Sequence, residues 1–242
     1  MWEDERIRSR KEQRKKQLHR RIAGSAFLMT AILLVLFVAF FHGKAQPSSL
    51  TFERAGQKTA ADEWEKYDIG DPVKQAAQPE LDVQLLTINE NSRPGIATDG
   101  VRSVVVHYTA NPGSTAQNNR DYFESLKDTG ENQVSSNFVI GLDGEIIQCI
   151  PTNEIAYASN SRNNDSVSIE CCHPDESGKF NEATYDSLVE LAAFLCGKFN
   201  LTMVIRHYDV TGKDCPKYFV EHEDAWNTFK ADVAKYIEEN GV

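Results

Sequence analysis

The stretch SVVVHY at residues 103–108 decides the fold class of this chain. Three consecutive valines, Val104 to Val106, are β-branched and apolar, which favours a strand buried on both faces. The run ends on His107 and Tyr108, so a polar ring lies at the C-terminal end of the predicted strand. The stretch therefore predicts a central strand of a sheet, with a candidate functional group at the C-terminal end of that strand.

Strand-like and helical patterns interleave on both sides of this stretch. Extended segments are expected at residues 81–87, 136–140, 145–150, 167–172 and 203–205, and helices at 115–126, 181–199 and 224–237. The sequence GLDG at 141–144 joins two of the strands and is typical of a hairpin. Interleaved strands and helices predict an α/β layer with helices on both faces of the sheet.

The N-terminal part has a different composition. Residues 1–21 contain nine Lys or Arg against four acidic residues, a net charge of +5. Residues 22–41 follow with no charged side chain, and about 20 apolar residues span the roughly 30 Å of a bilayer core. We expect a basic cytoplasmic head, a single transmembrane helix, a polar linker or stalk at 42–80, and an extracytoplasmic catalytic domain at 81–242.

A cleaved signal peptide is the alternative for the apolar run. Gly43-Lys44-Ala45 resembles a small-x-small cleavage site. The run is longer than the roughly 7–15 apolar residues of a signal peptide, which favours an uncleaved anchor. The predicted location is the cell membrane, with the N-terminus in the cytoplasm and the catalytic domain facing the cell wall.

The charge and cysteine content limit the function classes. Because the whole chain carries −10 and the head +5, the rest of the chain carries −15. An acidic body does not favour nucleic-acid binding, which needs a basic surface. The chain has five cysteines, an odd number, so at least one cannot be part of a disulfide within the chain. A disulfide between a pair such as Cys149 and Cys171 remains an alternative.

Three residues could hold a metal ion. His107 ends one predicted strand, His207 follows another, and Cys215 lies eight residues later in RHYDVTGKDCP. Two imidazoles and a thiolate suit Zn²⁺, and three protein ligands leave a fourth position free, as in catalytic sites. Taken singly, each residue also fits ordinary packing, and the spacing does not prove that the three meet.

Four sequence blocks, taken in order, resemble the zinc-dependent N-acetylmuramoyl-L-alanine amidases, the family that includes phage endolysins and animal peptidoglycan recognition proteins. The blocks are VVVHYTANPGSTAQNNRDYFESL (104–126), NFVIGLDGEIIQCIPTNEIAYAS (137–159), SVSIECC (166–172) and IRHYDVTGKDCP (205–216). The resemblance covers roughly residues 82–240. It implies a central mixed sheet flanked by helices and a zinc ion held by His107, His207 and Cys215.

The resemblance also implies the reaction and its catalytic residues. Members hydrolyse the amide between N-acetylmuramic acid and L-alanine in peptidoglycan. Glu170 matches a catalytic glutamate, and Lys213 matches a lysine that steadies the oxyanion. Strand alternation would place Ser168 and Glu170 on one face.

The chain also departs from the family pattern. Ser136 stands where some members have a catalytic tyrosine, and residues 157–160 (YASN) replace a segment that often carries a histidine.

Substrate contacts are less defined by the sequence. Candidate substrate residues are Tyr108, Asn111, Arg162 and Asn164, because they flank the first ligand or lie on a polar loop before the Glu170 strand. Asp209 is a candidate acceptor that would orient a histidine ligand. The alternative function is a catalytically inactive peptidoglycan-binding receptor, a role favoured in members that lack the cysteine ligand. A zinc hydrolase with another amide substrate and a membrane protein with merely packed Cys and His also remain open.

Overall fold

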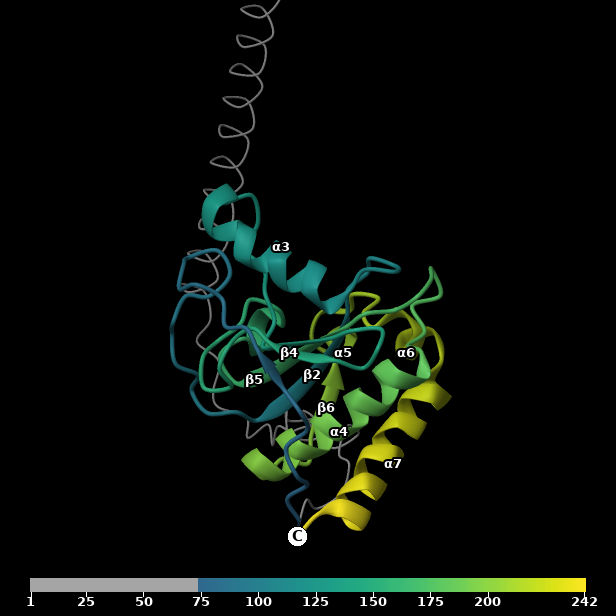
Figure 1. The fold of residues 1–242 in the computed structure, drawn as a ribbon. Coiled ribbons are helices and arrows are strands. Elements are labelled where there is room, and N and C mark those ends of the chain that lie inside the picture. The colour runs from purple at the N-terminus through teal and green to yellow at the C-terminus, as the bar shows by residue number, and fades with distance from the viewer. Residues whose placement is uncertain (1–73) are drawn as a thin grey trace, which may run out of the picture. The chain divides into compact units, whose positions relative to one another are not determined.

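The computed structural model describes residues 74–242, and Figure 1 shows their fold. The predicted head, transmembrane helix and most of the predicted linker lie outside the described residues. Within the described part, no helix is both long and apolar enough to cross a bilayer. The last residues of the predicted linker belong to the folded domain, because Ala76 is buried in its core and the backbone of Gln75 bonds to that of Val242.

A six-stranded sheet with the order β1-β4-β3-β5-β2-β6 forms the centre. Its strands are β1 (Asp82–Val83), β2 (Ser103–Tyr108), β3 (Phe138–Ile140), β4 (Ile146–Gln148), β5 (Ser166–Cys171) and β6 (Val204–Arg206). The β3–β4 pair is antiparallel and every other pair is parallel, so the predicted mixed sheet is confirmed. The predicted first strand is reduced to two residues.

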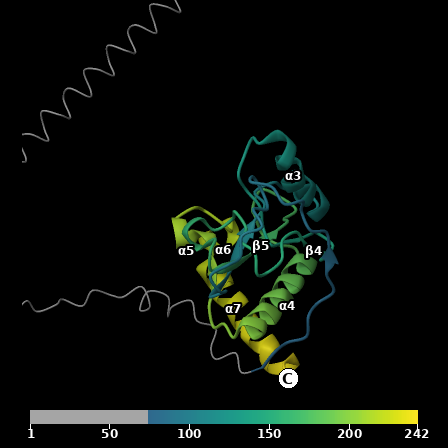
Figure 2. The same ribbon diagram turned by 90° about the vertical axis from the view of Figure 1, so that its left-hand side faces the viewer.

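Helices cover both faces of the sheet, as expected (Figures 1 and 2). α4 (Glu182–Phe199) and α7 (Glu223–Asn240) pack together on one face, and their apolar sides share a core with β2 and β5. α3 (Ala116–Thr129) covers the other face, where Phe123 packs near Val139 and Ile147. Val104 and Val105 are both fully buried on opposite faces of β2, which explains the uninterrupted apolar run.

Local sequence signals fix the helix ends. Thr115 and Asn118 form a reciprocal capping box at the start of α3, and Gly130 ends that helix with φ 61°. Asn181 caps α4 by accepting from the backbone N–H of Thr184. Three short elements were not predicted: the 3-10 turn η2 (Asn160–Arg162) and the helices α5 (His207–Thr211) and α6 (Lys217–Glu221).

The parallel arrangement of β5, β2 and β6 brings the candidate functional residues to one end of the sheet. The register pairs His107 directly with Glu170, and Val106 with Arg206. Because the C-terminal ends of parallel strands meet at one edge of a sheet, His107, Glu170 and the residue after β6, His207, lie at the same edge.

Candidate metal centre

His107 and Glu170 come from neighbouring strands and point to the face that α3 covers. Register partners of parallel strands project to the same face. One oxygen of Glu170 lies 3.9 Å from Nδ1 of His107. Ser168, two residues before Glu170, bonds to Ser136 and Asn137, so the position where some family members have a tyrosine is part of a buried serine and asparagine network here.

His207 and Cys215 are brought to the same edge by α5 and the turn that follows it. α5 begins at His207 directly after β6, and Gly212 ends it with φ 75°, a left-handed conformation that favours glycine. The chain then folds back, and the N–H of Tyr208 donates to the backbone oxygen of Cys215 at 2.8 Å. This bond holds the thiol next to the histidine pair.

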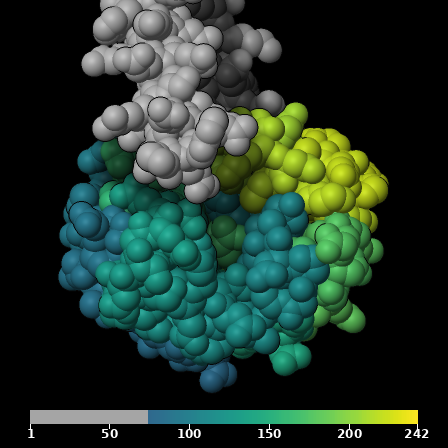
Figure 3. All heavy atoms as spheres, turned by 90° about the horizontal axis from the view of Figure 1, so that it is seen from above, coloured from purple at the N-terminus to yellow at the C-terminus, as the bar shows by residue number. Residues whose placement is uncertain are grey.

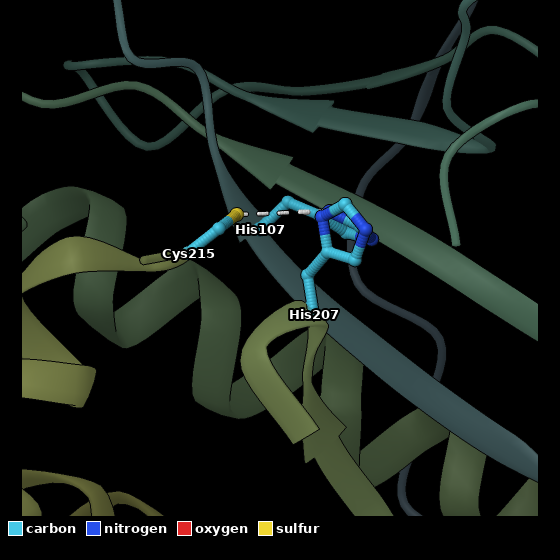
Figure 4. Close-up of side chains that lie close together, drawn as sticks. All are labelled: His107, His207 and Cys215. Atoms are coloured by element: carbon cyan, nitrogen blue, oxygen red, sulfur yellow. Dashed lines mark hydrogen bonds between the residues drawn. The ribbon is translucent and has the colours of Figure 1, made fainter. Parts of the chain in front are cut away.

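The three predicted ligands meet. Their ligand atoms all lie within 4.8 Å of one another, and the Sγ of Cys215 is 3.8 Å from Nδ1 of His107 (Figure 4). The two imidazole rings have centroids 4.6 Å apart. Tetrahedral zinc with the usual bond lengths would set its sulfur and nitrogen ligands about 3.6 Å apart, so the spacing and the donor set both fit zinc.

The two histidine ligands have the protonation state that metal binding needs, whereas the cysteine ligand must first lose a proton. Burial lowers the pKa of His107, and burial with the nearby charge of Lys213 lowers the pKa of His207 to about 4. Both imidazoles are therefore neutral near pH 7, as a ligand must be. Burial and the negative charge of Glu170 raise the pKa of the Cys215 thiol, so a metal must displace the thiol proton when it binds.

Glu170 is a buried carboxyl group with an unsatisfied atom. Its side chain is 15% exposed, and its Oε2 makes no hydrogen bond within residues 74–242. Burial raises the pKa of Glu170 to about 8, although the charge of Lys213 acts in the opposite direction. A cation bound beside it would favour the carboxylate and lower this pKa. An unpaired, proton-exchanging group at a candidate metal site is typical of a general base.

These groups line one cavity of about 280 Å³. Its walls include His107, Tyr108, Glu170, His207, Lys213 and Cys215. Seen from above, the surface is hollowed between segments from the early, middle and late parts of the described chain (Figure 3). The candidate metal ligands, the candidate base Glu170 and the positively charged Lys213 therefore face one cavity.

Other predicted residues have different places. Tyr108 lines the cavity, whereas Asn111 and Asn164 are exposed and do not line it. The structure does not bring Arg162 into the site, because its guanidinium bonds to Asp165 at 2.6 Å and to Ser103 at the opposite end of β2.

The prediction for Asp209 is wrong. Its carboxylate is 2% exposed and pairs with Arg206 at 2.9 Å, and it also accepts the backbone N–H of Arg206. It therefore caps α5 rather than contacting a histidine ligand.

The histidine ligands instead contact η2 and the residue before it. Nε2 of His107 lies 3.1 Å from Oγ of Ser159, and Nε2 of His207 lies 2.9 Å from Oδ1 of Asn160. These two residues could hardly be predicted from the sequence, because neither has a periodic or spaced signal. Only their place in the segment where the family pattern changes could have indicated them.

Comparison with protein families agrees with this geometry. The family model described as N-acetylmuramoyl-L-alanine amidase matches residues 97–218, just over half of the chain. This chain belongs to the N-acetylmuramoyl-L-alanine amidase family. The match begins before β2, ends inside α6, and includes all three candidate ligands, Glu170 and Lys213.

Relatives of this amidase-family chain are found in Bacillus. It is 34% identical over 160 residues to the N-acetylmuramoyl-L-alanine amidase CwlL of Bacillus licheniformis and 32% identical over 169 residues to the amidase BlyA of Bacillus subtilis strain 168. Each comparison covers 60% of this chain and 44% of the relative. The chain thus spans under half the length of the curated relatives it matches.

Solved structures share the fold of this amidase-family domain. PlyL superposes with a TM-score of 0.56 at 24% identity, covering 64% of this chain and 97% of PlyL. The catalytic domain of XlyA gives a TM-score of 0.54 at 25% identity, covering 64% of this chain and 99% of that domain. These similarities confirm the expected fold, a central sheet flanked by helices.

Proposed function

We propose that this chain is a zinc-dependent hydrolase of the amide bond between N-acetylmuramic acid and L-alanine in peptidoglycan. Family membership and the names of its relatives support the reaction. The observation that carries the proposal is the buried cluster of His107, His207 and Cys215 beside the carboxyl of Glu170, whose Oε2 has no hydrogen-bond partner among the described residues. A receptor that only binds would not need a complete ligand set together with a proton acceptor.

The proposed mechanism uses groups that line the same cavity. His107, His207 and Cys215 would hold the zinc ion, which would supply Lewis acidity toward the amide carbonyl and lower the pKa of water toward about 7. Glu170 then takes a proton from the attacking water and passes it to the amide nitrogen as the C–N bond breaks. Lys213 contributes a positive charge that stabilises the oxyanion.

Digestion of purified cell wall tests the reaction directly. The chain should release new L-alanine amino ends without new reducing sugars, and Glu170→Ala should lose most of this activity while binding zinc. Cys215→Ser should lose both the zinc and the activity. Glu131→Ala, which removes an exposed carboxylate after α3, is the matched control and should behave as wild type.

Two outcomes would contradict this function. New reducing sugars or D-amino ends would show that another bond is cut. Retention of wall without any new amino ends would favour the receptor alternative instead.

We also propose that residues 22–41 hold the domain at the cell membrane, with the N-terminus in the cytoplasm and the domain facing the wall. The uncharged 20-residue run and the basic cluster before it support this placement. In intact cells stripped of wall, an added protease should remove the domain but spare an epitope at the N-terminus. Recovery in the medium of a shortened chain that lacks the N-terminal epitope would indicate a cleaved signal peptide.

Tyr108 is our preferred substrate contact among the four sequence candidates. Its ring lines the cavity next to the ligand His107 and is partly exposed. An aromatic side chain with a hydroxyl group can pack against the sugar or stem peptide and bond to it. Tyr108→Phe should raise KM more than it lowers kcat.

A further inference from the structure

We propose that Ser159 and Asn160 are positioning residues that set the tautomers of both histidine ligands, leaving Nδ1 of each ring free to bind the metal. This inference rests on the proposed zinc site and adds two residues that act on it through His107 and His207. Both contacts come from consecutive residues of one turn.

The contact to His207 defines its tautomer. Oδ1 of Asn160 lies 2.9 Å from Nε2 of His207, and an amide oxygen only accepts hydrogen bonds. Nε2 must therefore carry the proton and donate it. A neutral imidazole has a single N–H, so Nδ1 of His207 keeps the lone pair that a metal needs.

The contact to His107 fits the same arrangement, because the hydroxyl of Ser159 can accept a hydrogen bond from Nε2. Nδ1 of His107 faces Cys215 at 3.8 Å and Glu170 at 3.9 Å, so this nitrogen is on the metal side of the ring. Nε2 is on the far side, 3.1 Å from Oγ of Ser159. Ser159 is only 1% exposed, so few other acceptors compete for this proton. In both rings Nε2 contacts the turn, which leaves Nδ1 as the nitrogen available to the metal.

The turn itself is firmly held. Asn163 accepts the backbone N–H groups of Ala158 and Ser159 through its side-chain oxygen, at 3.2 and 2.6 Å. The N–H of Asn163 donates to the backbone oxygen of Asn160. Asn160 has φ 52°, a left-handed conformation that asparagine adopts more readily than most residues. The backbone therefore presents both side chains to the rings from a fixed position.

A purely structural turn would not need these contacts. The side chain of Asn163 already accepts the backbone N–H groups of the turn. Asp209, the other residue that could orient a histidine ligand, is paired with Arg206 instead. Asn160 is exposed at the surface, yet its carboxamide reaches inward to a histidine that is 5% exposed. The side chains of Ser159 and Asn160 thus end on the two ligands themselves.

The test uses variants of the full chain that separate the acceptor from the backbone. Asn160→Gly removes the carboxamide and keeps the left-handed conformation, and Asn160→Asp keeps an acceptor. Ser159→Ala removes the other acceptor, and Ser161→Ala is the matched control in the same turn. Long-range ¹H–¹⁵N spectra of the metal-free proteins report the imidazole tautomers, and competition with a chromophoric chelator gives the zinc Kd.

Both histidines of the wild type should carry the proton on Nε2. Asn160→Gly should lose this preference at His207 and Ser159→Ala at His107, and each should weaken zinc binding by about 10- to 100-fold, the usual effect of losing a ligand-orienting partner. Asn160→Asp and Ser161→Ala should keep both the tautomers and the Kd.

Unchanged tautomers and an unchanged Kd in Asn160→Gly and Ser159→Ala would overturn the inference, even if their thermal stability fell. The proposed amidase reaction can be refuted independently of this inference. If the wild type released no L-alanine ends while the tautomer and zinc effects appeared, the reaction would be wrong and the orienting role would stand.

Discussion

Replacing Glu170 by glutamine should stabilise the metal-free protein at neutral pH but not at acid pH. The carboxyl lies beside His107, and its buried Oε2 has no partner in the described part of the chain; burial raises its pKa from 4.5 to about 8. Between these two values the unfolded chain loses this proton while the folded protein retains it. The unfolded state then binds fewer protons, so the free energy of unfolding falls as the pH rises from about 4.5 to about 8.

The size of the effect follows from the two pKa values. At pH 7 the wild type should have lost about 3 kcal/mol of unfolding free energy relative to pH 4 through this one group. Glutamine does not titrate and avoids the loss. For a domain of this size, about 3 kcal/mol corresponds to a Tm difference of roughly 6–12 °C.

Thermal and urea unfolding of both proteins, treated with a chelator and compared at steps from pH 4 to pH 9, measure this difference. The curves should coincide near pH 4 and separate up to about pH 8, with the variant more stable. A difference that is constant across this range, or a variant that is less stable at pH 8, would refute the burial argument.

Glu154→Gln is a matched control with the opposite sign. Glu154 has a similar exposure, 19% of its side chain, but it pairs with Arg93 through two hydrogen bonds that lower its pKa. The pair contributes stability above the unfolded pKa, and this is lost as the pH falls through the lower folded value. The variant should be less stable than wild type at pH 7, and the difference should shrink in acid.

Three further predictions concern packing, capping and metal. Phe229 is fully buried and stacks on Phe219 at 5.4 Å, so Phe229→Ala should lower the free energy of unfolding by about 3–5 kcal/mol in urea titrations; a loss below about 1 kcal/mol would contradict this packing. Asp209→Ala removes the more buried of the two acidic partners of the buried Arg206 and should cost about 3–5 kcal/mol by the same method, whereas retained stability would show that the pair is dispensable. Zinc at about 1,000 times its Kd should stabilise the protein by roughly 4 kcal/mol, seen as a rise in Tm that Cys215→Ser does not show.

Much of the fold could be predicted because its signals are local. The apolar run of β2, the GLDG hairpin and the helical stretches of α3 and α4 depend on neighbouring residues, and the structure confirms them. The short elements could not be predicted in this way. α5 and η2 have too few residues to show a helical period.

The site could be predicted only through the resemblance. His107 and Cys215 are separated by 108 residues, so no local pattern shows that they meet. The role expected for Asp209 was wrong because the closer partner, Arg206, occupies the carboxylate. Ser159 and Asn160 were missed because hydrogen bonds from a turn to a distant ring have no sequence period.

The wide separation of the three ligands has a consequence for when the protein acquires its chemistry. His107 is made early, but the cluster lacks a ligand until residue 215 has been synthesised and has folded against β2. At about 5–20 residues per second, the first ligand waits some 5–20 seconds for the last. A nascent or prematurely terminated chain that ends before this point has no complete metal site. For a protein that we propose cuts the wall of its own cell, incomplete copies would then be harmless.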